Sequence, residues 1–214
     1  MKIRLFTKIL ILPICLSLLI GFASTIYAQK TNKAGIISKL EGAAEVRPRG
    51  KLIFATATVN QSLFVGDSVR TKDDGWVQIT LDNGNVITLK ENSNLLIKKF
   101  VQNLDTGEYE NILDMNLGKL RAKVEGLKGD SVFEIHTPTA VAAARGTIIY
   151  IEASSELSKL LVEEGLVDFM NKLSGMKVVV KGGETSSSYR DGTISNPCIP
   201  SSGQRSGSVT GFSR

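Results

Sequence analysis

The sequence contains little of what metal sites and catalytic centres are built from, with one histidine and two cysteines in 214 residues. His136 is the only histidine, so a site that needs two histidines is excluded, and zinc bound there would need cysteine ligands. Cys15 lies in an apolar N-terminal run, which leaves Cys198 as the one thiol of the remaining chain. A single thiol cannot form an internal disulfide, so the apolar core must hold the fold together, with Cys198 free or paired with another molecule.

Catalytic motifs are missing as well. The chain has no G-x-S-x-G elbow, no G-x-x-x-x-G-K-[ST] phosphate loop and no G-x-G-x-x-G turn. His136 shares a strand face with Glu134 while Phe133 and Ile135 point the other way, and this predicts an outward, structural residue. The Asp and Glu residues that could be paired for acid–base catalysis fall in turn sequences. Carboxylates in turns more often bond their own backbone. We therefore expect no catalytic residue, no cofactor, no metal and no enzymatic activity.

Charge of one sign and aromatic side chains are also scarce. The formal net charge is +5, but removing Lys2, Arg4 and Lys8 from the 26 basic residues leaves 23 against 21 acidic ones, an excess of +2. Nucleic acid is therefore not an expected partner. Aromatic residues make up 6% of the chain, with one Trp and four Tyr, which disfavours but does not exclude a glycan ligand.

The first 28 residues have the pattern of an export signal. A basic start precedes an apolar run that begins at Ile9, and small residues lead to Ala28. We expect cleavage between Ala28 and Gln29, and hence a location in the periplasm or on the surface of a bacterium. The alternative is a retained membrane anchor, because Ile9 to Ala28 is an uncharged stretch of 20 residues.

The rest of the chain reads as one domain followed by a tail. Residues 29–181 show no composition break that would mark a second domain, and we expect one β domain over residues 29–195. Nine Ser and six Gly lie between Gly182 and Arg214, a composition typical of a flexible segment. Order should therefore fade beyond Gly182, with residues 196–214 forming a flexible tail.

Strand signals with Asp-x-Gly turns predict an all-β fold. Residues 76–81 and 86–89 alternate apolar and polar positions on either side of Asp82-Asn83-Gly84. A three-residue loop there pairs Ile79 with Ile87 and Val77 with Leu89, which keeps the apolar face whole.

The same three-residue loop applied to residues 73–75 sets Thr71 opposite Val77 and Val69 opposite Ile79, which makes a meander. Applied to residues 105–107, it pairs Phe100 with Ile112 and Lys98 with Asp114. All three turn glycines should then have positive φ, because they occupy left-handed positions: Gly75, Gly84 and Gly107.

Further strands are expected at Ala44 to Arg47, Lys119 to Val124, Val132 to Thr137, Thr147 to Glu152 and Lys177 to Val180. One segment also fits another pattern. Ser154 to Gly165 matches a helix template, with a Ser N-cap and a Gly terminator, and a helix remains the minority alternative there.

Four ordered stretches resemble the FecR domain: residues 63–71, 79–89, 118–121 and 137–147, with 162–167 and 178–183 resembling the closing hairpin and final strand of that family. The resemblance extends over about residues 35–195. Its signature residues are Gly66, Asp67, Val69, Thr71, Gly84, Gly118, Thr137, Pro138, Thr139, Arg145, Gly146, Thr147 and Gly165.

The resemblance implies an extracytoplasmic all-β module, a twisted solenoid-like or roll-like stack of short strands that binds a protein without catalysis. Family members that regulate iron uptake place a cytoplasmic anti-sigma segment before a membrane span. Here only Met1 to Lys8 precede the apolar run, so we expect a stand-alone exported module that contacts an envelope protein in signalling or assembly. A glycan- or peptidoglycan-binding module is the alternative.

Two signature segments allow two interpretations each. Arg145 could turn inward to loop carbonyls or to a carboxylate such as Asp67, or it could bind an acidic group of a partner. Residues 137–144 are small and apolar, which suits close packing between strands, or an exposed edge that accepts a partner strand. The membrane is expected as a partner only if the N-terminal segment is retained.

Overall fold

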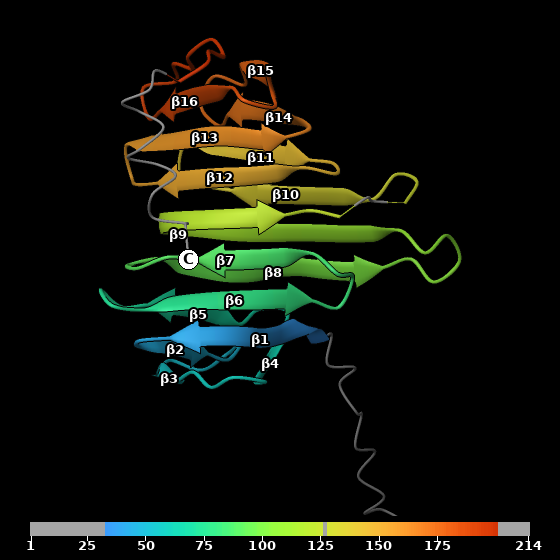
Figure 1. The fold of residues 1–214 in the computed structure, drawn as a ribbon, viewed down its shortest axis with the longest axis vertical. Helices are drawn as coiled ribbons and strands as arrows, with labels where there is room; N and C mark the ends of the chain where they lie inside the picture. Colours follow the sequence, from blue (N-terminus) through green and yellow to red (C-terminus); the bar gives the residue numbers. More distant parts are fainter. Residues whose placement is uncertain (1–32, 126–127, 201–214) are drawn as a thin grey trace, which may run out of the picture. The chain divides into compact units, whose positions relative to one another are not determined.

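The computed structural model describes residues 33–125 and 128–200, and these residues form sixteen strands with no helix (Figure 1). The all-β prediction is therefore confirmed. The strands are β1 (Lys33–Glu41), β2 (Ala44–Arg47), β3 (Ala55–Thr56), β4 (Ser62–Phe64), β5 (Ser68–Thr71), β6 (Trp76–Leu81), β7 (Val86–Leu89), β8 (Asn94–Gln102), β9 (Tyr109–Lys123), β10 (Val132–His136), β11 (Ala140–Ala144), β12 (Ile148–Ala153), β13 (Leu157–Glu164), β14 (Leu166–Asn171), β15 (Lys177–Lys181) and β16 (Thr185–Tyr189).

The strands pair into two layers that pack face to face. We call layer A the strands β4-β1-β6-β7-β9-β12-β13-β16, in their order of pairing. Layer B has the order β3-β2-β5-β8-β9-β10-β11-β14-β15. The β9–β10 pair is parallel and all the others are antiparallel, so the sheet is mixed.

β9 belongs to both layers. Its first part, up to Leu117, pairs with β8 and β10 in layer B, whereas Gly118 to Lys123 pair with β7 and β12 in layer A. Gly118 has φ 104° at this crossing, a conformation that favours glycine because it has no Cβ. The crossing strand joins all sixteen strands into one hydrogen-bonded network.

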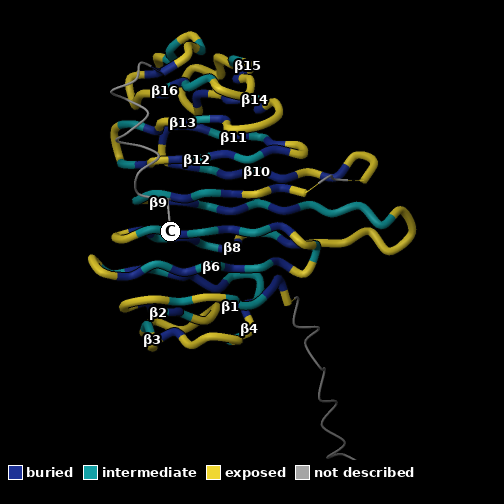
Figure 2. The backbone as a smooth tube through the Cα atoms, in the orientation of Figure 1, coloured by how far each residue is buried: buried dark blue, intermediate teal, exposed yellow. Residues whose placement is uncertain are grey.

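Alternation along each strand builds the core between the layers (Figure 2). In β6, for example, Val77, Ile79 and Leu81 are buried while the residues between them are partly exposed. The largest fully buried side chains are Phe133 and Phe169 of layer B. Each fully buried side chain of this size contributes about 1.5–3 kcal/mol of transfer free energy.

The β6–β7 hairpin has the predicted register, with Val77 opposite Leu89 and Ile79 opposite Ile87. Gly84 has φ 91°, as the three-residue loop predicts.

The predicted β5–β6 meander is wrong. Val69 pairs with Val46 and Leu95 in layer B, whereas β6 lies in layer A. Residues 73–75 therefore form a corner between the layers. Gly75 does not have positive φ, and a Cβ at this position would lie 2.1 Å from the Ala43 carbonyl oxygen, so close approach explains the glycine.

The β8–β9 register differs by one residue from the prediction. Phe100 pairs with Asn111 because Leu104 to Gly107 form a four-residue loop, closed by the Gly107 N–H on the Asn103 carbonyl at 2.8 Å. A bulge between Ile97 and Lys99 shifts the register again. The Lys98–Asp114 ion pair nevertheless forms, at 3.3 Å, and Gly107 has the predicted positive φ of 72°.

Two further expectations are wrong near the C-terminus. The minority helix alternative for residues 154–165 is wrong, because residues 157–164 of this segment form strand β13. The segment from Gly182 onward does not lose order at once, because residues 185–189 form β16 and Cys198 pairs with Thr185.

The predicted cleavage site at Ala28 and Gln29, and residues 201–214 of the predicted tail, lie outside the described residues. Within residues 33–125 and 128–200, no helix is long and apolar enough to cross a membrane.

Candidate binding surfaces

The signature around Asp67 organises a turn. Its buried carboxylate accepts the backbone N–H groups of Arg49 and Phe64, each at 2.9 Å, and Gly66 beside it has φ 96°. Val69 lies in the core, and the Thr71 hydroxyl donates to the Lys90 carbonyl at 2.5 Å. This part of the signature fixes backbone geometry.

Arg145 does not contact Asp67. Its guanidinium donates to the Gly129 carbonyl, so a loop carbonyl is its partner, as one interpretation predicted, and Asp67 is not. The residue is exposed, so the predicted inward turn is wrong. Gly146 next to it has φ 61°, and Gly165 has φ 91° with the Thr147 side chain against it. These residues shape the turns between the layers.

A buried hydroxyl network holds β16 to layer B. Thr139 and Ser158 join their side-chain oxygens at 2.7 Å, and the Ser188 hydroxyl donates to the Thr139 carbonyl at 3.1 Å. The amide of Asn171 donates to Ser188 Oγ at 2.9 Å. The Thr137 hydroxyl joins this network, donating to the Ala140 carbonyl at 3.1 Å, while Pro138 lies in the turn between them.

The segment 137–144 is not an edge. Its strand, β11, pairs with β10 on one side and β14 on the other, so the exposed-edge interpretation is wrong for these residues.

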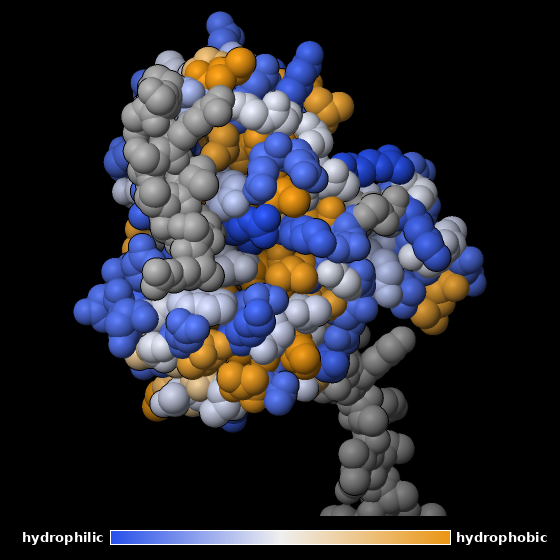
Figure 3. All heavy atoms as spheres, in the orientation of Figure 1, coloured by the Kyte–Doolittle hydropathy of each residue, from blue (hydrophilic) through white to orange (hydrophobic). Residues whose placement is uncertain are grey.

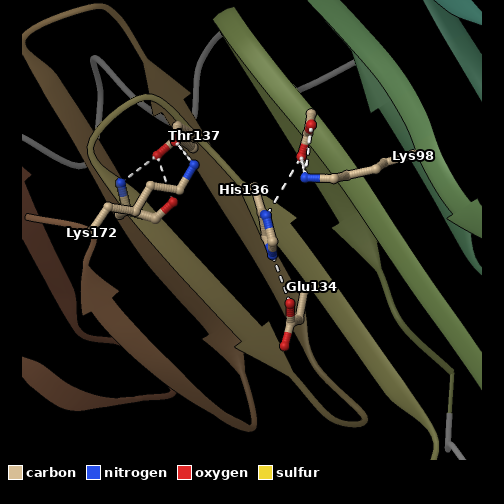
Figure 4. A network of polar contacts seen from close by, with 7 residues as sticks. Lys98, Glu134, His136, Thr137 and Lys172 are labelled. Carbon is tan, nitrogen blue, oxygen red and sulfur yellow. Dashed lines mark hydrogen bonds and ion pairs between the residues drawn. The ribbon is translucent and has the colours of Figure 1, made fainter. Parts of the chain in front are cut away.

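His136 lies on the outer face of layer B with Glu134, as predicted, within a row of charged groups (Figure 4). Its Nε2 is 2.6 Å from Glu134 Oε2, and its Nδ1 is 3.5 Å from Asp114 Oδ1. Nearby, Lys172 Nζ donates to the Thr137 carbonyl, and burial lowers the pKa of this amine. Both ring nitrogens are engaged by carboxylates and the ring is 18% exposed, so the arrangement is suited to holding strands together.

The outer face of layer A carries a pocket of about 420 Å³ beside β16. Its lining residues include Tyr150, Glu152, Lys159, Ser187 and Cys198. In Figure 3, hydrophilic and hydrophobic residues are interspersed on this face. Cys198 is exposed, and the sole histidine is on the other layer, so no nucleophile–base pair forms here. No group of His, Cys, Asp and Glu among the described residues could hold a metal ion.

The sheet edges are the remaining candidate surface, because backbone N–H and C=O groups can be left unpaired there. At one end of the stack the edge strands are short, three residues in β4 and two in β3. At the other end β16 is covered, because residues 193–198 bond to it from Ser195 N–H to the Ser187 carbonyl and from Thr185 N–H to the Cys198 carbonyl, each at 2.8 Å. Only β15, with five residues, leaves a longer edge open within the described chain (Figure 1).

Successive residues of β15 direct their backbone N–H and C=O groups alternately toward β14 and toward the open edge. The bonds Asn171 N–H to Met176 carbonyl and Gly182 N–H to Gly165 carbonyl fix the pattern, so even-numbered residues face β14. Lys177, Val179 and Lys181 therefore point their N–H and C=O groups outward. Glu184 occupies both groups of Lys181, through its carboxylate and its own N–H at 2.9 Å each.

Apolar side chains surround this edge. Val179 is 48% exposed and Met176 49%, and on the neighbouring strand Leu166 is 56% and Met170 36% exposed. The sequence of residues 177–180 predicted a strand there, but not that this strand would end a layer. The sequence signal was the pair of lysines that flank three valines, a pattern typical of protected edge strands.

Comparison with known proteins places part of the chain in a family. Residues 67–168 match the family model described as "FecR protein". Two crystal structures described as "a putative anti-sigma factor from Parabacteroides distasonis ATCC 8503", at 1.65 and 2.50 Å, have TM-scores of 0.51 and 0.50 to this chain, with 19% identity. The alignments cover 62% of this chain and 59% of the other, so the likeness concerns the fold. No curated protein matches the chain.

Proposed function

Since residues 67–168 of this chain form a FecR family domain, we propose that the protein is a binding module that contacts another protein of the bacterial envelope without catalysing a reaction. The observation that carries this proposal is the β15 edge, where unpaired backbone groups and exposed apolar side chains lie together. His136, whose two ring nitrogens contact Glu134 and Asp114, and the exposed Cys198 on the other layer support the non-catalytic part.

Location is the second part of the proposal. Residues 1–28 act as an export signal that is removed between Ala28 and Gln29, which delivers the domain to the periplasm or the cell surface. The basic start and the apolar run support this. Intact-mass measurement of protein from isolated envelopes tests it, because a mass that includes Met1 to Ala28 would replace cleavage by a retained anchor.

The biological role of the contact is signalling. In this role the domain would receive a signal from an envelope protein or transmit one to it, which the family match and the anti-sigma-like fold support. Assembly of the envelope is the other process in which such a binding module would act.

Capture from envelope extract tests the binding function. Purified, exported protein is immobilised and offered detergent-solubilised envelopes, and retained molecules are identified by mass spectrometry and glycan analysis. We expect one or a few proteins to be retained reproducibly. Retention of glycan without protein would overturn the proposal in favour of a glycan-binding module. Turnover lost on changing one carboxylate would contradict the non-catalytic part.

A further inference from the structure

We propose that β15 is the docking edge and that its occupant is an extended partner segment with three apolar residues between two acidic ones. This inference rests on the proposed protein-binding function and adds the place and the chemistry of the contact. The partner would continue layer B as one more strand beside Lys177–Lys181.

The backbone offers a short, defined set of bonds. Lys177 and Val179 each direct one N–H and one C=O outward, whereas Glu184 already occupies the outward groups of Lys181. Four main-chain hydrogen bonds are therefore available to an added strand. Such a limited set gives modest affinity by itself, so side chains must supply the rest.

The side chains that would flank the added strand alternate between the two faces. Lys177, Val179 and Lys181 lie on the outer face, while Val178 and Val180 point toward the core. Residues opposite each other in a β pair interact directly. A partner therefore needs an apolar residue opposite Val179 and apolar residues at the two inward positions.

Charge selects the ends of the partner segment. Among the described residues Lys181 has no ion-pair partner, and Lys177 has only Asp168 at 3.0 Å, with its side chain 53% exposed. Two ammonium groups thus stand one at each end of an apolar strand. An acidic residue opposite Lys177 would form a cross-strand pair. At Lys181 the backbone groups are taken by Glu184, so main-chain pairing ends before it, and the second acidic residue would approach the Lys181 ammonium from just beyond the paired stretch. The complement of Lys-Val-Val-Val-Lys is therefore acidic, apolar, apolar, apolar, acidic.

The same lysines disfavour a second copy of this chain. Pairing β15 with β15 would line up four ammonium groups along one seam, with Lys177 and Lys181 contributed by both copies. Like charges across a strand pair destabilise it. A partner of opposite charge is therefore the occupant that fits this edge.

Binding of two synthetic peptides to the full exported chain tests the inference. The probes are a capped, fluorescein-labelled Gly-Ser-Glu-Val-Val-Val-Glu-Ser-Gly and the same peptide with both Glu replaced by Lys, measured by fluorescence anisotropy at low salt. We expect the acidic peptide to bind at least tenfold more tightly, with the difference shrinking as salt is added. Equal binding of the two peptides would overturn the charge assignment.

Variants of the edge test its position. Val179→Pro removes an N–H that points away from β14, so the fold should persist while the acidic peptide loses at least tenfold in affinity. Val179→Thr keeps the N–H and should retain affinity within about threefold. Lys181→Glu, which leaves the backbone intact, should weaken the acidic peptide and strengthen the lysine peptide. Unchanged binding by both Val179→Pro and Lys181→Glu would overturn the inference.

Envelope capture with the same variant separates this inference from the proposed function. If wild-type protein captures a partner and Val179→Pro, folded by circular dichroism, captures the same partner equally well, the β15 assignment is wrong and protein binding stands. If the wild-type protein captures no protein, the proposed function itself fails. Capture by wild type that is lost in Val179→Pro and retained in Val179→Thr would support both.

Discussion

Leu117 and Gly118 are consecutive residues of β9, yet they bond into different layers: Leu117 pairs with Asn94 of β8 in layer B, and Gly118 with Ala153 of β12 in layer A. The turn of the backbone between them requires φ 104° at Gly118. A Cβ at this residue would lie 2.3 Å from Ser93 Oγ and 2.4 Å from Ser93 Cα. Both conformation and space therefore require glycine.

Gly118→Ala should accordingly destabilise the domain by about 3 kcal/mol or more, since strain and overlap with the Ser93 backbone add. Gly84→Ala is the matched control, because Gly84 also has positive φ but a Cβ added there would have no other atom within 4 Å. It should cost about 1 kcal/mol. Urea unfolding followed by circular dichroism measures both, and equal losses would contradict a steric role for Ser93.

The hydroxyl network gives a second pair of variants. Thr139→Val removes a buried hydroxyl that bonds Ser158 at 2.7 Å and the Ser188 carbonyl at 2.9 Å, and should cost about 1–3 kcal/mol. Thr147→Val should be neutral or stabilising, because Thr147 Oγ1 is buried without a hydrogen-bond partner. Thermal unfolding compares them, and hydrogen exchange at 185–189 should rise only in Thr139→Val.

Acid should weaken the N-terminal end of the stack. Hydrogen bonds from Arg70 and Lys72 lower the pKa of Glu45 below the ordinary value of 4.5. A carboxyl whose pKa is lower in the folded state stabilises the protein above its unfolded pKa, and this contribution disappears as pH falls through the folded value. Wild type should therefore exceed Glu45→Gln in melting temperature at pH 7, and the difference should shrink below pH 4.5. A difference that stays constant down to pH 3 would contradict this role.

His136 should be dispensable for partner binding. It lies on β10, and β11 and β14 separate that strand from β15, a span of roughly 14 Å at about 4.8 Å between strands. Glu134→Ala and His136→Ala should leave the affinity for a captured partner unchanged within about twofold. A tenfold loss in either, with the fold intact, would move the binding surface from the edge to the outer face of layer B.

Local pattern predicted the β6–β7 hairpin because only one register keeps Val77, Ile79, Ile87 and Leu89 on one face. The same pattern failed for residues 73–75. A period of two in the sequence shows which side of a strand is buried. In a two-layer fold the strands of both layers bury one side, so the period does not show to which layer a strand belongs. The sequence around Val69 and Ile79 therefore could not tell whether the two strands lie in one layer or in opposite layers.

The strands missed near the C-terminus share a physical cause. In β16 the inward positions are Ser186 and Ser188, and in β13 one of them is Ser158, so apolar alternation is broken where the interior is built from hydroxyls. Ser158 and Ser188 bond to Thr139, and Ser188 also to Asn171, while the Ser186 hydroxyl donates to the Ser195 carbonyl, so the partners come from other segments of the chain. The open β15 edge was equally hidden, since which strand ends a layer depends on the whole order of pairing.

The place of β9 in both layers also bears on how the protein assembles. Every strand before β9 in the chain lies on one side of it in the stack, and every strand after β9 lies on the other. When the chain becomes available from its N-terminus onward, β1 to β8 can thus pair with one another and with β9 before the later strands are present. The strands β10 to β16 can then pair onto β9. Growth in this direction makes β15 and β16 the last strands to be placed.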